Sequence, residues 1–256
     1  MIGRIIGTSI GAARNGLARG LIALGVTPNA LTVFGTALTV CGGVCFAAGV
    51  AFDTTWLYVG AGLLVASCAC DMLDGAVARI GKQTTPFGAM LDSTMDRLSD
   101  FAIFAGISVG FALKGEPNYT FALAAQIAFF NGFMISYTRA RAEDLIESCS
   151  VGFWQRGERM AAVLIAAFAV NIPALVLQQA VLPFFTAARR LLHTRRVLAG
   201  KAGAGDPAGR SLLQTLQIWR HRRMSVGYDI TCAIMIAWLI FGRFDWPDPL
   251  GMLAGR

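Results

Sequence analysis

Residues 71–96 read DMLDGAVARIGKQTTPFGAMLDSTMD, and this stretch decides the fold. It carries four aspartates between two long apolar runs, namely Asp71, Asp74, Asp92 and Asp96. The flanking runs have the character of membrane helices, where a carboxylate at mid-bilayer costs roughly 2.5–3.5 kcal/mol on insertion scales. Four carboxylates in such a setting need compensating charge, and bound cations supply it most directly.

The composition is that of an integral membrane protein. Of the 256 residues, 55% are hydrophobic and only 14% are charged, whereas soluble domains carry about 25% charged residues. The net charge of +7 comes from basic residues that flank the apolar runs, as membrane topology requires. No basic stripe is interleaved with aromatic residues, so we do not expect a nucleic-acid partner.

The apolar runs predict an all-α bundle of six transmembrane helices. The expected spans are residues 29–52, 55–79, 86–112, 119–142, 158–170 and 174–192. Thr85-Pro86 is a helix-start signal, a capping residue followed by proline at the first helical position. The fifth span is shorter than the about 20 residues that a spanning helix needs. We therefore expect its start to be extended by residues around Arg159 that line a wet cavity.

The two ends of the chain extend beyond this membrane domain, which we place at residues 27–197. Residues 1–26 alternate apolar and basic positions, a pattern typical of an amphipathic helix on the membrane surface. Residues 198–256 contain a Gly/Ala-rich linker, an amphipathic basic helix over 211–224 and an apolar segment over 226–241. That segment fits either a seventh transmembrane helix or a surface or re-entrant helix.

The distribution of basic residues predicts the orientation. With the N-terminus inside, only Lys114, Arg243 and Arg256 of the 22 lysines and arginines fall outside. The positive-inside rule then places the loop between the second and third spans, and the four aspartates, on the cytoplasmic face.

The spacing of the aspartates predicts a metal site. Residues three or four positions apart share a helical face, and a short loop makes their two helices antiparallel neighbours. Four convergent carboxylates suit Mg²⁺, or Mn²⁺, and could hold two ions about 3.5–4 Å apart. The alternatives are interhelical salt bridges or an ion pathway, but Arg79, Lys82 and Arg97 are too few to pair every carboxylate.

Small residues beside the aspartates predict a nucleotide site. Gly75, Ala78 and Gly88 would let a nucleotide approach the backbone closely, and Arg79 could reach a phosphate or ribose from the same face. The alternative for the two glycines is helix–helix packing. Gly106 and Gly110 form a separate G-x3-G, which could serve a dimer or the bundle interior.

The pattern D-x2-D-G-x2-A-R-x8-G-x3-D-x3-D is matched by Asp71, Asp74, Gly75, Ala78, Arg79, Gly88, Asp92 and Asp96. In this respect residues 20–197 resemble the CDP-alcohol phosphatidyltransferase family. The resemblance implies a homodimeric six-helix enzyme that moves a phosphatidyl group from a CDP-linked lipid to an alcohol and releases CMP. It implies that the four aspartates bind one or two metal ions and that Asp96 is the general base. Asn29 and Thr32 would hold the CDP moiety, unless Asn29 is a plain helix cap.

A group of arginines predicts a phosphorylated acceptor. It consists of Arg139, Arg141, Arg156, Arg159 and, further along the chain, Arg190. Arginine forks suit phosphate, although arginines at helix ends are often topology anchors.

The segments ISYTRARAE (135–143) and VGFWQRGER (151–159) resemble the phosphatidylinositol-phosphate synthase branch of the family. The branch implies CDP-diacylglycerol and inositol phosphate as substrates and a bacterial-type plasma membrane. Glycerol 3-phosphate is the second candidate acceptor. An ion-coupled transporter that uses the same carboxylates is the alternative from another class.

Overall fold

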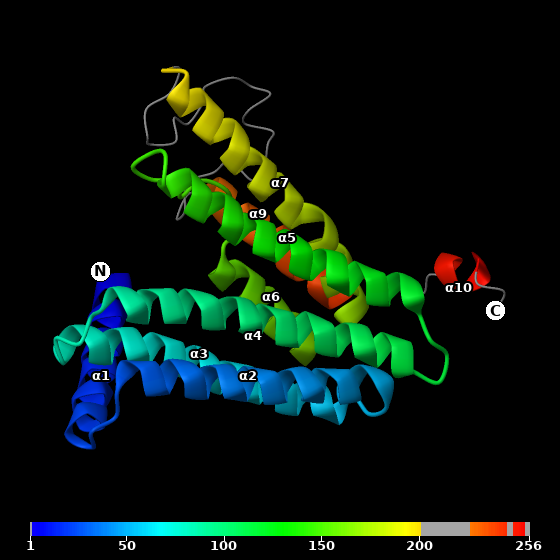
Figure 1. Cartoon of the computed structure of the whole chain (residues 1–256). Helices are drawn as coiled ribbons and strands as arrows, with labels where there is room; N and C mark the ends of the chain where they lie inside the picture. Colours follow the sequence, from blue (N-terminus) through cyan, green and yellow to red (C-terminus); the bar gives the residue numbers. More distant parts are fainter. Residues whose placement is uncertain (1, 201–225, 245–247, 254–256) are drawn as a thin grey trace.

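The structure is a computed structural model that describes residues 2–200, 226–244 and 248–253 (Figure 1). The basic helix expected over 211–224 and most of the linker before it lie outside the described residues. All regular structure in the described ranges is helical.

Each of the six expected spans is a helix, and their bounds agree with the predicted ones within a few residues at most ends. The helices are α1 (Ile2–Ala23), α2 (Pro28–Ala51), α3 (Thr55–Ile80), α4 (Pro86–Leu113), α5 (Tyr119–Glu143), α6 (Arg156–Phe168), α7 (Ile172–Leu198), α9 (Val226–Phe241) and α10 (Pro249–Leu253). The largest difference is at the end of α7, which runs six residues past the expected 192.

Four helices, α2, α3, α5 and α7, are long and apolar enough to cross a membrane. The chain is therefore a membrane protein. Helix α4 carries Asp92, Asp96, Arg97 and Asp100, which lower its hydropathy. Helix α6 has only 13 residues, about 20 Å of helix.

The helices form two groups that meet at α4 and α6 (Figure 1). Helices α2, α3 and α4 lie side by side, with α1 across the end where α2 begins. Helices α5 and α7 form the second pair and cross above the first group, and α6 lies between the two groups. One hydrophobic core of buried side chains runs through both groups.

Close backbone contact joins α2 to α4. A Cβ atom at Gly106 would overlap the carbonyl oxygen of Gly43, and one at Gly110 would lie 2.7 Å from the carbonyl oxygen of Ala47. The G-x3-G of α4 therefore packs inside the bundle, against α2 of the same chain, as small residues at membrane helix interfaces often do.

Two capped helix starts bring the motif together. Thr27 Oγ1 accepts a hydrogen bond from the Ala30 amide at 3.3 Å and starts α2, while Thr85 Oγ1 accepts one from the Gly88 amide at 2.9 Å and starts α4. The start predicted at Thr85-Pro86 is thus confirmed. Since α3 ends at Ile80, a short turn brings the aspartates of α3 and α4 to the same end of the bundle.

The C-terminal segment is attached to the bundle at several points. The indole of Trp238 on α9 donates to the carbonyl of Ala174 at 3.1 Å, and the Asn171 side chain donates to the carbonyl of Leu239 at 2.9 Å. Asp248 accepts from the Tyr119 and Thr120 amides at the start of α5, at 2.9 and 3.0 Å. Desolvation opposes ionisation of Asp248, but these bonds and that from the Thr120 hydroxyl lower its pKa to about 2.

The contact between Gly106 and Gly43 generates a stability prediction. We expect Gly106→Ala to lower the free energy of unfolding by about 1–3 kcal/mol, because the added methyl group forces α4 away from α2. Thermal unfolding in detergent micelles measures the change.

Gly62→Ala is the matched control, because a Cβ atom at exposed Gly62 meets nothing within 4 Å. There the better helix propensity of alanine should leave stability unchanged or raise it by up to about 1 kcal/mol. Equal unfolding temperatures for the two variants would contradict the close packing.

Candidate active site

Three of the four predicted aspartates converge. Oxygen atoms of Asp71, Asp74 and Asp92 all lie within 4.8 Å of one another, with Asp71 exposed, Asp92 half-buried and Asp74 buried. Asp74 is oriented by the Thr32 hydroxyl of α2, which donates to its Oδ2 at 2.6 Å. Three carboxylates at this spacing supply only hard oxygen donors, which fits Mg²⁺ or Mn²⁺.

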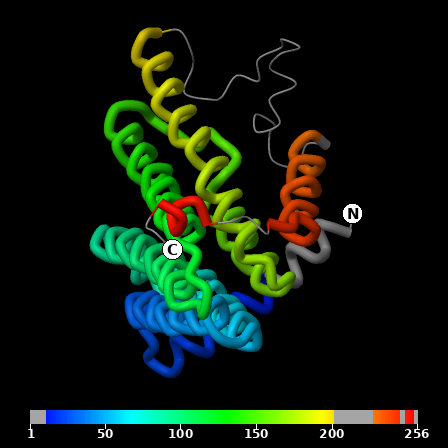
Figure 2. The backbone as a smooth tube through the Cα atoms, turned by 90° about the vertical axis from the view of Figure 1, so that its right-hand side faces the viewer, coloured from blue at the N-terminus to red at the C-terminus, as the bar shows by residue number. Residues whose placement is uncertain are grey.

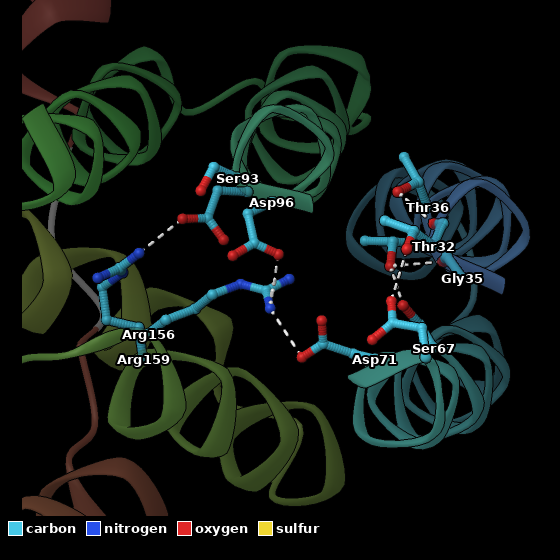
Figure 3. Close-up of polar contacts among 12 residues, drawn as sticks. Thr32, Gly35, Thr36, Ser67, Asp71, Ser93, Asp96, Arg156 and Arg159 are labelled. Atoms are coloured by element: carbon cyan, nitrogen blue, oxygen red, sulfur yellow. Dashed lines mark hydrogen bonds and ion pairs between the residues drawn. The ribbon is translucent and has the colours of Figure 1, made fainter. Parts of the chain in front are cut away.

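The fourth aspartate, Asp96, is connected to this group through an arginine. The Arg156 guanidinium of α6 lies 2.8 Å from Asp96 Oδ1 and 3.1 Å from Asp71 Oδ2. Figure 3 shows Arg156 reaching between the two carboxylates, which come from α4 and α3. The positive charge of α6 thus holds together two helices whose carboxylates repel each other.

All six residues predicted to hold the nucleotide line one cavity of about 190 Å³. They are Asn29, Thr32, Gly75, Ala78, Arg79 and Gly88. Asp74 and Asp92 also line it, so this cavity borders two of the three carboxylates.

The contacts of individual residues bear on the two readings given above for Asn29 and for the glycines. A Cβ atom at Gly75 would first meet the Arg79 guanidinium, at 3.3 Å. A Cβ atom at Gly88 would approach Thr85 Oγ1 to 3.1 Å and Asn29 Oδ1 to 3.4 Å, so both glycines border the cavity wall rather than another helix backbone. The N-cap of α2 is Thr27, which leaves the Asn29 side chain available to the cavity.

A second cavity, of about 570 Å³, contains four of the five predicted acceptor arginines. These are Arg139, Arg156, Arg159 and Arg190, and Asp96 lies in the same wall. Arg156 and Arg159 come from the first turn of α6, as the short fifth span led us to expect. Arg141 is not brought to this cavity: it forms an ion pair with Asp144 at 2.8 Å, and its side chain is 67% exposed.

Asp100 is a site residue that we did not predict. Its carboxylate pairs with Arg159 at 2.6 Å, with side-chain exposures of 7% and 1%. A buried arginine without a partner would be strongly destabilising, so Asp100 makes the position of Arg159 possible. The signal was in the sequence, because Asp100 continues the four-residue spacing of Asp92 and Asp96.

Arg190 and Arg139 are fixed by their own partners. Buried Arg190 of α7 donates to the carbonyls of Val151 and Ile135, which ties the loop before α6 to α5 and α7. Arg139 donates to Glu143 one turn along α5 at 2.9 Å. These two arginines are thus held in place before any ligand binds.

The two cavities meet at the acidic residues. Asp74 and Asp92 border the cavity of about 190 Å³, Asp96 borders the arginine cavity of about 570 Å³, and Arg156 contacts both Asp71 and Asp96. Such an arrangement can hold two phosphate-bearing molecules on opposite sides of one metal-binding cluster.

Known proteins share this sequence and fold. A family model described as CDP-alcohol phosphatidyltransferase matches residues 25–195. An archaetidylinositol phosphate synthase from Methanothermobacter thermautotrophicus is 39% identical over 156 residues, which cover 59% of this chain and 76% of that protein. A phosphatidylinositol phosphate synthase from Mycobacterium tuberculosis is 36% identical over 159 residues, covering 61% of this chain and 70% of the relative.

Two crystal structures of phosphatidylinositol phosphate synthase from Mycobacterium tuberculosis resemble the fold. The structure with CDP-DAG bound has a TM-score of 0.65 and 32% identity, and covers 77% of this chain and 98% of that one. The complex with manganese and citrate has a TM-score of 0.63 and 31% identity, and covers 81% and 100%. From the family match over most of its length, with the motif and the site built on it, we conclude that this chain belongs to the CDP-alcohol phosphatidyltransferase family.

Proposed function

We propose that the protein transfers the phosphatidyl group of CDP-diacylglycerol to inositol phosphate and releases CMP. The observation that carries this proposal is the position of the acidic cluster between a cavity lined by the motif residues and a cavity lined by four arginines. Family membership favours this transferase over the ion-coupled transporter.

The acceptor is proposed from the arginine cavity. Four guanidinium groups suit a phosphate on the acceptor better than a neutral polyol, and about 570 Å³ leaves room for a ring beside that phosphate. The two relatives described above differ in the lipid that their names specify but agree on inositol phosphate. Glycerol 3-phosphate remains the second candidate, because it would present the same phosphate.

Different residues have different roles in the proposed reaction. The acceptor hydroxyl attacks the phosphorus that carries diacylglycerol, the bond from that phosphorus to the CMP oxygen breaks, and Asp96 takes the hydroxyl proton. The CDP moiety lies against Gly75, Gly88 and Arg79, while the arginine wall orients the acceptor phosphate. One or two divalent cations, Mg²⁺ or Mn²⁺, held by Asp71, Asp74, Asp92 and Asp96 would neutralise the diphosphate.

The finer membrane arrangement belongs to the same proposal. Helices α4 and α6 would complete a six-helix bundle, with α1 on the membrane surface and the active site on the cytoplasmic face of a bacterial-type plasma membrane. We further propose a homodimer, and the division of the chain into 1–26, 27–197 and 198–256. The basic residues around the motif end of the bundle support this orientation.

An acceptor assay tests the function. Purified protein with CDP-diacylglycerol and Mg²⁺ should release CMP when inositol phosphate is added, and not with free inositol, because the arginines need a phosphate. If glycerol 3-phosphate supports CMP release and inositol phosphate does not, the acceptor is glycerol 3-phosphate and the proposed type of reaction stands. Metal flux in liposomes without CMP release from any acceptor would refute the transferase.

Asp96→Asn tests the general base. We expect kcat to fall by about 10²–10⁴-fold at saturating Mn²⁺, because the amide cannot accept the hydroxyl proton. Mn²⁺ binding, followed by electron paramagnetic resonance, should persist, since Asp71, Asp74 and Asp92 still converge. Asp92→Asn is the comparison that should weaken Mn²⁺ binding directly. A fully active Asp96→Asn enzyme would show that another group takes the proton.

Arg139 and Arg141 form a matched pair, because they lie two residues apart and only Arg139 lines the cavity. We expect Arg139→Gln to raise the KM for inositol phosphate by about tenfold through the loss of a charged hydrogen bond. Arg141→Gln should leave it within about twofold, as for other exposed ion pairs. Steady-state kinetics measure both, and the KM for CDP-diacylglycerol serves as the control. Equal effects of the two substitutions would argue against this assignment of the cavity.

A further inference from the structure

The first turn of α6 sends charged side chains in two opposite directions. Arg156 and Arg159 reach Asp71, Asp96 and Asp100 on one side. Glu158, between them in the sequence, faces α9, where the Tyr228 hydroxyl donates to its Oε1 at 2.9 Å. The same turn therefore connects the arginine cavity to the C-terminal helix.

Local structure does little to fix this turn. Gln155 is the N-cap of α6 but makes no capping hydrogen bond through its side chain, and α6 has only 13 residues. The rotation of α6 about its axis thus depends on contacts that its side chains make with other helices.

Packing against α9 leaves room for that rotation. A cavity of about 400 Å³ lies between α6, α7 and α9, and Gly157, Ala161, Ala162 and Ile165 of α6 line it. Figure 2 shows α9 standing to one side of α7 and α5. The cavity interrupts the packing of this part of α6 against α9, and the bond between Tyr228 and Glu158 spans the gap.

In the middle of α9, the Gln178 side chain of α7 donates to the Met235 carbonyl at 3.3 Å. Other attachments of α9 lie farther from the arginines along the helix. Trp238 and Leu239 contact Ala174 and Asn171, at the turn between α6 and α7. Tyr228 is near the opposite end of α9, and its ring lies 5.2 Å from that of Phe153 in the loop before α6. The start of α6 and the start of α9 are thus joined at the site end.

We propose that Tyr228 is a positioning residue for the acceptor site: through Glu158 it sets the rotation of α6 and so the positions of Arg156 and Arg159. A rotation of about 10° moves a group 6 Å from a helix axis by about 1 Å, and an error of that size can cost up to about 10²-fold in rate. Helix α9 lies beyond the family match over residues 25–195. The contact of Tyr228 with α6 therefore comes from a segment outside the matched domain. The proposal rests on the acceptor-binding role of the arginines.

Tyr228→Phe tests it, because the substitution keeps the ring against Phe153 and removes only the hydroxyl. Trp238→Phe is the matched control, since it removes the bond from α9 to Ala174 and leaves Tyr228 intact. Two kinds of measurement are made on the full-length protein. Calorimetry gives the affinity for inorganic phosphate, and steady-state kinetics give the KM values for inositol phosphate and CDP-diacylglycerol.

We expect Tyr228→Phe to weaken phosphate binding and to raise the KM for inositol phosphate, each by about three- to tenfold. The KM for CDP-diacylglycerol should stay unchanged, and Trp238→Phe should resemble the wild type. Adding Glu158→Gln to Tyr228→Phe should cause little further loss, because partners in one bond are not additive.

Three other outcomes overturn the inference. Wild-type phosphate affinity and KM in Tyr228→Phe would show that α9 does not position the arginines, with the proposed function intact. An equal loss in Trp238→Phe would indicate general loosening of the fold. A wild-type protein that neither binds phosphate nor uses inositol phosphate would refute the proposed acceptor and this inference together.

Discussion

The active site depends on the need to hold like charges together. Oxygen atoms of three carboxylates lie within 4.8 Å of one another, and their mutual repulsion would separate α3 from α4. Arg156 opposes this by contacting Asp71 on α3 and Asp96 on α4. Helix α6 therefore stabilises the acidic cluster and also lines the arginine cavity. Any cation that binds the aspartates shares them with this guanidinium.

The bundle is rigid on one side of the site and open on the other. On the side of α2 and α4, glycines bring backbones into direct contact, and Thr39 of α2 donates to Ser67 of α3 at 2.7 Å in the buried interior. On the side of α9, cavities of about 400 and 420 Å³ separate the helices. The aspartates thus lie on the closely packed group, while Arg156 and Arg159 lie on α6, which borders one of these cavities.

Local signals in the sequence predicted the helices well, and also the convergence of Asp71, Asp74 and Asp92. Apolar runs and the Thr85-Pro86 start depend on neighbours along the chain, and so do the spacings that place Asp71 beside Asp74. What they could not predict is how helices far apart in the sequence are rotated toward one another. Arg139 and Arg141 lie two residues apart, and only the rotation of α5 decides which one faces the cavity. Likewise, nothing near Glu158 in the sequence points to Tyr228, 70 residues away.

The shortness of α6 has a consequence for how a lipid reaches this site. Thirteen residues span about 20 Å, whereas the hydrocarbon core is about 30 Å thick. In the membrane arrangement proposed above, with the far end of α6 at the opposite surface, the shortfall would lie at its first turn. Arg156 and Arg159 would then lie below the plane of the lipid head groups. The acceptor would then be held at the depth of the lipid diphosphate, so the lipid could react with its chains still in the bilayer and avoid the cost of about 0.8 kcal/mol for each methylene lifted into water.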